Sequence, residues 1–188
     1  LHHHGSNPMR SLITGLLAAA VTATVLGQQA VAAEPTLVTP KVLIADPGAK
    51  PEQVQAQTLA ARRYATFWSS GDPALARQAL APDFMDRALP PGRAQGIAGP
   101  LAASTAFHAA VPDLNCEVQQ MIVSGDRVVS FLRFTGHFTG TFNGVKGQGQ
   151  AVNFIATDVY RIADGRIAEN WHLEDNLTFL QQIGVIAP

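Results

Sequence analysis

The strongest constraint on the fold lies near the end of the chain, in a pattern of strand, turn and strand. Two runs of alternating apolar and polar residues, 154–162 and 166–172, flank a short polar turn. Ala163-Asp164-Gly165 favours a three-residue hairpin loop, in which a type I turn is closed by a glycine in the left-handed region. This loop would place Ile162 opposite Arg166 and pair the two runs as antiparallel strands.

One face of this hairpin carries an unusual mixture of side chains. Because side chains alternate between the two faces of a strand, the even-numbered residues of both runs should share a face. That face combines a carboxylate, an imidazole, a phenol and an amide with apolar neighbours, which is typical of a pocket lining. Its members are Phe154, Ala156, Asp158, Tyr160, Ile162, Ala168, Asn170 and His172, whereas Thr157, Val159, Arg161, Ile167, Glu169 and Trp171 take the other face.

Asp158 and His172 are the candidate catalytic residues of this face. A carboxylate near an imidazole in an apolar pocket suits acid–base work, because burial and a charged neighbour move each pKa toward the working pH. We expect the two side chains to lie within hydrogen-bond or one-water reach. Tyr160 or Asn170 could donate a hydrogen bond to an enolate oxygen as charge develops there. The alternative is a structural pair in a pocket that only binds a ligand.

The N-terminal region has the pattern of a secretory signal. Residues 1–8 look like the remnant of a purification tag, so Met9 is the expected natural start. Arg10 is followed by an apolar run, 12–26, that is too short to span a bilayer comfortably. A stable membrane anchor is therefore the weaker alternative, and the run would have to be covered by an apolar surface in any chain that keeps it.

A signal peptide is accordingly expected over 9–33. Small residues near its end match a cleavage site, with the cut after Ala32 or Ala33. The mature protein would then be secreted or periplasmic. Residues 34–50, rich in proline, are expected to form a linker before a single domain over 51–188.

Charge and cysteine content exclude several classes of function. The net charge is −1, and no cluster of lysines and arginines occurs in the mature sequence, so no nucleic acid partner is expected. The single cysteine, Cys116, cannot form a disulfide within the chain. No spacing matches a nucleophile elbow, a phosphate-binding loop or a cluster of metal ligands, so covalent and metal mechanisms are disfavoured.

Helical patterns come first in the domain and strand patterns follow. Helices are expected over 51–69, from 73 to 80 and before Pro112, and a last helix is expected to follow the strands after Asp175. The strand-like region, 115–173, predicts a four-stranded antiparallel meander and hence an α+β fold. A curved sheet wrapped around so few helices forms a cone with an apolar cavity. The candidate pocket residues are Tyr64, Trp68, Phe84, Phe107, Phe154, Tyr160 and Asn170.

Six short motifs occur in an order that resembles a known family. Each is weak alone, but together they are similar to the SnoaL-like polyketide cyclases, also called predicted ester cyclases, of the nuclear transport factor 2-like superfamily. The resemblance covers roughly residues 51–186. The motifs are Phe67 to Asp72, Leu80 to Phe84, Val111 to Leu114, Thr139 to Gly144, Asp158 to Arg161 with Asp164 to Ile167, and Leu180 to Val185.

The resemblance implies a conical α+β barrel, often dimeric, with a deep pocket and neither a metal nor an organic cofactor. In the characterised cyclases a histidine on the penultimate strand and an aspartate on the last strand carry out the acid–base steps. Here those positions are Asp158 and His172, so the two identities are exchanged. A family histidine has also moved by one residue to His137, which places it on the opposite face of its strand.

The resulting functional hypothesis is acid–base chemistry on a small hydrophobic carbonyl compound. Aldol-type cyclisation, isomerisation and hydrolysis all need such a site. The alternative is a non-catalytic binding or carrier protein for a small hydrophobic ligand, since one fold hosts many functions.

Overall fold

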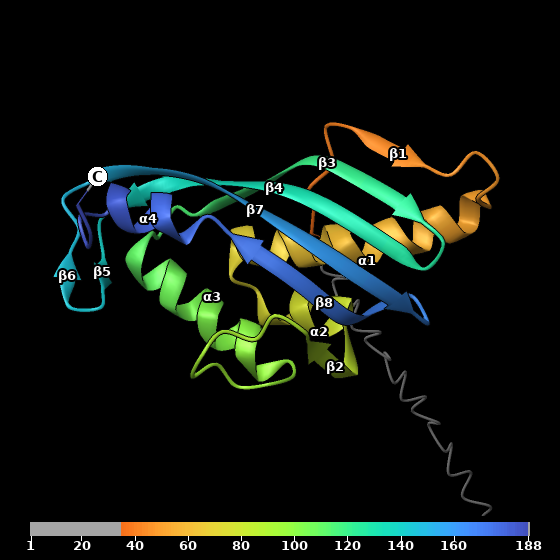
Figure 1. Cartoon of the computed structure of the whole chain (residues 1–188), viewed down its shortest axis with the longest axis horizontal. Coiled ribbons are helices and arrows are strands. Elements are labelled where there is room, and N and C mark those ends of the chain that lie inside the picture. The colour runs from red at the N-terminus through yellow and green to blue at the C-terminus, as the bar shows by residue number, and fades with distance from the viewer. Residues whose placement is uncertain (1–34, 188) are drawn as a thin grey trace, which may run out of the picture. The chain divides into compact units, whose positions relative to one another are not determined.

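The computed structural model describes residues 35–187, which form one unit of mixed helices and strands (Figure 1). The α+β fold expected from the sequence is confirmed. The elements in chain order are β1 (Leu43–Ala45), α1 (Pro51–Ser70), α2 (Pro73–Ala79), β2 (Leu80–Asp86), α3 (Ala98–Ala110), β3 (Asn115–Ser124), β4 (Arg127–Phe138), β5 (Thr141–Phe142), β6 (Val145–Lys146), β7 (Gln150–Ala163), β8 (Arg166–Glu174) and α4 (Asn176–Gln182).

The main sheet has six strands in the order β1-β3-β4-β7-β8-β2. Its four central strands pair antiparallel in sequence order, so the predicted meander is present. The two edge strands were not predicted as part of the sheet. Both β1 and β2 pair parallel with their neighbours, β3 and β8. A separate hairpin of β5 and β6 turns at Asn143 and Gly144, both of which have positive φ.

Residues 35–50, expected as a linker, pack along the rest of the described chain. Leu37 and Val38 lie against the hydrophobic core. The backbone N–H of Val38 donates to Thr66 Oγ1 at 2.9 Å, and Arg62 Nε donates to the Val38 carbonyl at 2.8 Å. The strand β1 then runs beside β3, with Leu43 opposite Met121.

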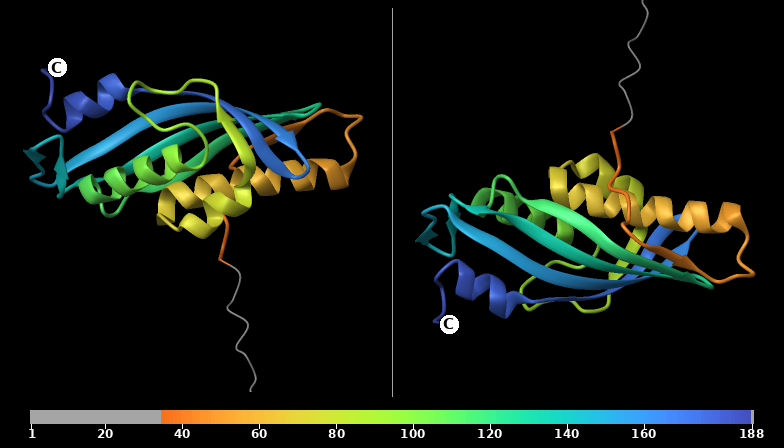
Figure 2. Two further views of the ribbon diagram at one scale, coloured as in Figure 1. Left: turned by 90° about the horizontal axis from the view of Figure 1, so that it is seen from below. Right: turned by 90° about the horizontal axis from the view of Figure 1, so that it is seen from above.

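The helices lie on the concave face of the curved sheet (Figure 2). Burial alternates along β4 and β7, because one set of side chains points toward the helices and the other points away. The inward set packs against α1, α2 and α3 to form the core. This arrangement leaves the polar residues of β7 and β8 on the same side of the sheet as the helices.

The ends of the first two helices follow from single residues. Pro51 begins α1, where its missing N–H costs no hydrogen bond. Gly71, with φ of 70°, ends α1 as its N–H donates to the Phe67 carbonyl at 2.8 Å. The Asp72 side chain then accepts from the Ala74 N–H at 2.9 Å and caps α2.

The hairpin of β7 and β8 closes with a two-residue turn, so the predicted three-residue loop was wrong. Asp164 and Gly165 have φ of 49° and 71°, which is typical of a type I′ turn. Ala163 pairs with Arg166, where the sequence predicted Ile162. The Asp164-Gly165 pair is itself a common signal for this turn, so the error lay in the choice of loop length.

A bulge in β8 then restores the predicted faces. The register shifts by one residue just after the turn, which leaves Ala168 as an extra residue on β8. Together the turn and the bulge move the pairing by two residues, and a shift of two preserves the face of every side chain beyond the bulge. Ile167 lies before the bulge and is fully buried, contrary to its predicted outward face. Beyond the bulge, Asp158 pairs with His172 and Tyr160 pairs with Asn170.

The predicted tag remnant, signal peptide and apolar run 12–26 lie outside the described residues. Among the helices of residues 35–187, none combines the length and the apolar character needed to cross a membrane.

Candidate active site

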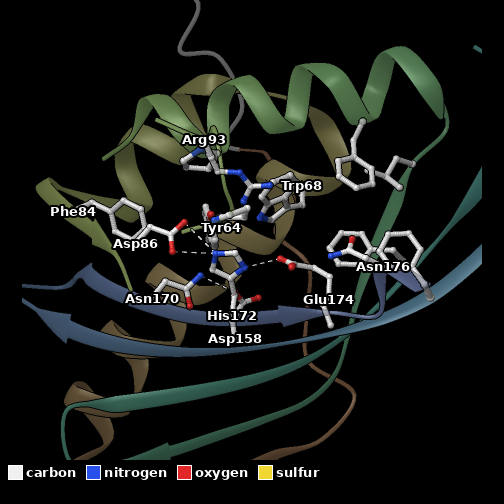
Figure 3. A pocket seen from close by; sticks show the side chains of 17 residues that line it. Tyr64, Trp68, Phe84, Asp86, Arg93, Asp158, Asn170, His172, Glu174 and Asn176 are labelled. Carbon is white, nitrogen blue, oxygen red and sulfur yellow. Dashed lines mark hydrogen bonds and ion pairs between the residues drawn. The ribbon is translucent and has the colours of Figure 1, made fainter. Parts of the chain in front are cut away.

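A cavity of about 120 Å³ opens on the concave side of the sheet, between the strands and the helices (Figure 3). Every predicted pocket residue except Tyr160 lines it, and so do both candidate catalytic residues. The lining comprises Tyr64, Trp68, Phe84, Asp86, Pro90, Arg93, Pro100, Phe107, Leu114, Phe134, Phe154, Ala156, Asp158, Asn170, His172, Glu174 and Asn176.

One wall of the cavity is built from packed aromatic rings. Phe134 of β4 and Phe154 of β7 stack with ring centroids 5.1 Å apart. Phe107 of α3 stacks on Phe154 at 6.2 Å, and Trp68 of α1 meets the edge of Phe134 at 6.4 Å. Interlocked rings of this kind hold a fixed apolar surface, against which a hydrophobic ligand can pack.

Asp158 lies on the sheet side of the cavity and is almost completely buried. Its Oδ1 accepts a hydrogen bond of 2.6 Å from Asn170 Nδ2, and the carboxyl group lines the cavity. Burial raises the pKa of Asp158 to about 6, although the hydrogen bond from Asn170 and the positive charge of His172 oppose the rise. The carboxyl group is therefore a base whose pKa is close to neutral pH.

His172 is held between two carboxylates. Its Nδ1 lies 2.7 Å from Glu174 Oε1, and its Nε2 lies 3.0 Å from Asp86 Oδ2 (Figure 3). Burial alone would lower the pKa of His172, but the hydrogen bonds and charges of Glu174 and Asp86 outweigh it and raise the pKa to about 9. The imidazole is thus a cation at neutral pH, and both of its N–H groups have partners.

The two predicted catalytic residues converge on one cavity, as expected, but without a direct hydrogen bond. Asp158 and His172 face each other across neighbouring strands and share the cavity, but no hydrogen bond joins them. The carboxylates that bind the imidazole are Asp86 and Glu174, which the sequence analysis did not name as site residues. Their charge keeps His172 protonated, so Asp158 is the candidate base of the pair.

Of the three missed residues, Asp86, Arg93 and Glu174, only Glu174 has a signal in the sequence. Asp86 is the last residue of β2. It reaches the cavity because β2 pairs with β8, which places Asp86 opposite Asn170. Glu174 lies two residues after His172 on β8, and alternate residues of a strand share a face. The strand pattern therefore places Glu174 on the same face as His172. Arg93 comes from the loop between β2 and α3, where no periodic pattern predicts the direction of a side chain.

Tyr160 does not belong to the cavity surface. Its side chain is fully buried, and its ring packs edge-on against Tyr64 at a centroid distance of 5.9 Å. Its hydroxyl has no hydrogen-bond partner among the described residues. The strand pattern gave the correct face for Tyr160 but not its depth, so the predicted role in donating to a ligand oxygen has no support in its position.

His137 lies at the protein surface, as its shifted position in the sequence implied. Its Nδ1 is 2.7 Å from Asp113 Oδ2, and the side chain is 60% exposed. Within residues 35–187, no group of three or more histidine, cysteine, aspartate or glutamate side chains has an arrangement that could hold a metal ion.

Comparisons with known proteins give a consistent result. A family model described as SnoaL-like polyketide cyclase matches residues 58–183. The crystal structure of a candidate polyketide cyclase from Bacillus cereus ATCC 10987 is 36% identical, covers 80% of this chain and 95% of its own, and superposes with a TM-score of 0.73. No functionally curated protein is similar enough in sequence to count as a match.

Two proteins from Streptomyces are also similar in structure. IdmH, a candidate polyketide cyclase of Streptomyces antibioticus, is 28% identical over 68% of this chain and 98% of its own, with a TM-score of 0.61. TsrD of Streptomyces laurentii is 25% identical over 73% of this chain and 99% of its own, with a TM-score of 0.63.

Proposed function

The chain belongs to the SnoaL-like polyketide cyclase family, and on that premise we propose that it catalyses an acid–base reaction on a small hydrophobic carbonyl compound without a cofactor. Aldol-type cyclisation, isomerisation and hydrolysis are the reaction types that the proposal includes. The observation that carries it is the Asp158 carboxyl group, whose pKa of about 6 and position in the cavity lining suit a general base in a mostly apolar cavity.

In this proposal Asp158 removes a proton from the carbon next to the carbonyl group. The resulting enolate oxygen carries negative charge, which the His172 imidazolium stabilises because it is a cation in a poorly hydrated site. Asn170 fixes one oxygen of Asp158 and so orients the other toward the ligand. Asp86 and Glu174 keep the proton on His172 and hold its ring in place.

The proton that Asp158 takes can return to a different atom. Its return to another carbon completes an isomerisation, and its delivery to a new alkoxide oxygen completes an aldol closure. In hydrolysis the same carboxylate would instead remove a proton from an attacking water. All three reactions share the first requirement, which is an ionised Asp158.

A direct test is the elimination of 5-nitrobenzisoxazole, which needs only a base that removes a carbon-bound proton. Proton loss from its C3 breaks the N–O bond and releases 2-cyano-4-nitrophenolate, whose colour reports the rate. The wild-type chain should accelerate this reaction, with a rate that rises as the pH passes about 6 and Asp158 ionises.

Asp158→Asn should remove most of the acceleration, because it keeps the shape of the side chain and deletes the base. Asp83→Asn is the matched control, since Asp83 is an exposed carboxylate outside the cavity. Equal rates for wild type and Asp158→Asn would refute the catalytic proposal and leave the second candidate function, a carrier of small hydrophobic ligands. The locked position of His172 between two carboxylates is the observation that favours that candidate.

We also propose that two copies of the chain associate through the outer face of the sheet. Phe131, Thr157 and Leu173 form one row across β4, β7 and β8, and exposed Ile155 lies beside it. Leu173 is 77% exposed, which is unusual for a leucine on a sheet. Leu173→Lys should convert a dimer into a monomer in light-scattering measurements, whereas a wild-type monomer would contradict the proposal.

Export of the protein is a further proposal, supported by the signal pattern over 9–33. Expression in a bacterial host with an intact secretion pathway should give a mature chain that starts at Ala33 or Glu34. Mass spectrometry of the secreted or periplasmic protein would measure the start, and a chain that keeps residues 9–33 would contradict the proposal.

A further inference from the structure

Arg93 enters the cavity from the loop between β2 and α3. Figure 3 shows its guanidinium group on the side opposite the strands, facing the cavity that Asp158 and His172 line. The side chain is half-buried. Arg93 therefore places a permanent positive charge at the cavity wall, within reach of a ligand that enters the cavity.

No direct contact joins the guanidinium group of Arg93 to the site described above, although its charge helps to lower the pKa of Glu174. Among residues 35–187, no ion pair or side-chain hydrogen bond includes its guanidinium group, although three carboxylates line the same cavity. Two of them, Asp86 and Glu174, are bound to His172. A guanidinium group that is partly removed from water and makes no direct ion pair or hydrogen bond has N–H donors that can bind an anion.

The direction of the Arg93 side chain is fixed by its surroundings. Its aliphatic stem packs against Gly99 in α3, where an added Cβ would lie 3.2 Å from Arg93 Cγ. Gln95, two residues after Arg93, makes two hydrogen bonds to the backbone of Asp86. Its Oε1 accepts from the Asp86 N–H at 2.7 Å, and its Nε2 donates to the Asp86 carbonyl oxygen at 2.9 Å. These contacts tie the loop to the end of β2 and hold Arg93 over the cavity.

The size of the cavity limits the ligand that Arg93 could hold. A volume of about 120 Å³ is close to that of cavities, about 150 Å³, that bind benzene. One ring with a short substituent fills such a space, and any further group reaches the mouth. Aromatic side chains surround the ring position, whereas Arg93 offers paired N–H donors that match the two oxygens of a carboxylate.

We infer that Arg93 forms a carboxylate subsite, so that the natural ligand is a small, mostly apolar carboxylic acid bound as its anion. Its ring or chain contacts the aromatic wall, its carboxylate pairs with Arg93, and its reacting carbon faces Asp158. The inference rests on the proposed function for the role of Asp158 only, because the binding of an anion needs no turnover.

The test compares 3-phenylpropanoate with 3-phenylpropanamide, which have the same shape and differ in charge. Calorimetry on the full chain should show that wild type binds the acid about tenfold more tightly than the amide. Arg93→Gln should bind the two equally, with the affinity for the amide changed less than about twofold. Arg77→Gln is the matched control, because Arg77 is exposed on α2 outside the cavity, and it should behave as wild type.

Other outcomes would overturn the inference. These are equal affinities of wild type for acid and amide, the absence of binding of both, and an unchanged preference in Arg93→Gln. If Arg93→Gln fails to fold, the salt dependence of binding to wild type provides the test. The preference of wild type for the acid over the amide should fall at high ionic strength, and a constant preference would overturn the inference. Loss of 5-nitrobenzisoxazole elimination in Asp158→Asn is a separate result, so either proposal can fail alone.

Discussion

Two pairs of histidine and aspartate lie in different regions of the molecule, and their surroundings differ far more than their geometry. At the surface, His137 Nδ1 and Asp113 Oδ2 are 2.7 Å apart, and the two side chains are 60% and 54% exposed. In the cavity, His172 Nε2 and Asp86 Oδ2 are 3.0 Å apart, with exposures of 6% and 5%. The distance between the ring nitrogen and the carboxylate oxygen is shorter in the surface pair, yet water and salt screen the charges of that pair. Burial, and not the length of the contact, decides which pair controls stability and chemistry.

The largest expected effect comes from removing each histidine in turn. His172→Ala leaves the carboxylates of Asp86 and Glu174 in the cavity without their cation, and we expect the free energy of unfolding to fall by about 3 kcal/mol. His137→Ala should change it by less than about 0.5 kcal/mol. Urea unfolding of both variants measures the difference. Equal losses of the free energy of unfolding would contradict the role that we give to burial.

The second prediction concerns alkaline pH. The folded-state pKa of His172 is about 9, above the usual unfolded value of about 6.5. Its contribution to stability is therefore complete below pH 6.5 and is lost as the pH rises through 9. The free energy of unfolding should fall by about 2 kcal/mol across this window.

This pH dependence should disappear in His172→Gln and persist in His137→Gln, which serves as the matched control. Unfolding curves at a series of pH values give the slopes. A slope that vanishes in the His137 variant instead would assign the alkaline transition to the surface pair.

Asp158 sharpens the comparison, because it is buried like Asp86 but has no cation bound to it. Its folded-state pKa is raised to about 6 from the usual value near 4, so stability falls as the pH rises through this range and Asp158 loses its proton. Asp158→Asn should therefore stabilise the fold by about 1–2 kcal/mol at neutral pH while it removes the proposed activity. Thermal unfolding at pH 5 and pH 8 tests the sign, since the gain should be larger at pH 8.

The smallest expected effect is that of salt. At about 1 M NaCl the screening length falls to about 3 Å, which weakens interactions between exposed charges. A double-mutant cycle should give a coupling between Asp113 and His137 that is small and falls further with salt. The cycle for Asp86 and His172 should give a coupling that salt changes little, and an equal sensitivity of both cycles would contradict the role given to burial.

Local patterns predicted much of the fold. Pro51, Gly71 and the Asp72 cap gave the helix ends almost to the residue, because each acts through its own backbone geometry. The hairpin of β7 and β8 was harder to predict from the sequence. The Asp164-Gly165 pair favours a two-residue turn that the three-residue prediction overlooked, whereas the extra residue Ala168 could not be inferred locally. The faces were predicted correctly only because the two deviations sum to an even shift.

The polar residues of the site were predictable only where one hairpin carries them. Asp158, Asn170 and His172 are close in sequence, so strand alternation placed them together. Asp86 binds His172 from 86 positions away, through a parallel pairing of edge strands that no local pattern indicates. Tyr160 shows the other limit, because periodicity gives the face of a strand residue and not how deeply helix packing buries it.

The two hydrogen bonds between Gln95 and the backbone of Asp86 have a consequence for the redesign of this protein. They hold the backbone of Asp86 from the far side of the loop, while the Ala88 N–H donates to Asp86 Oδ1 at 2.9 Å from the near side. The entropy of loop closure changes slowly with loop length, so residues can be added or removed within 89–94 at a modest cost in stability. A library confined to 89–94 could therefore vary which ligands enter, while Asp86 and the residues proposed for proton transfer keep their positions.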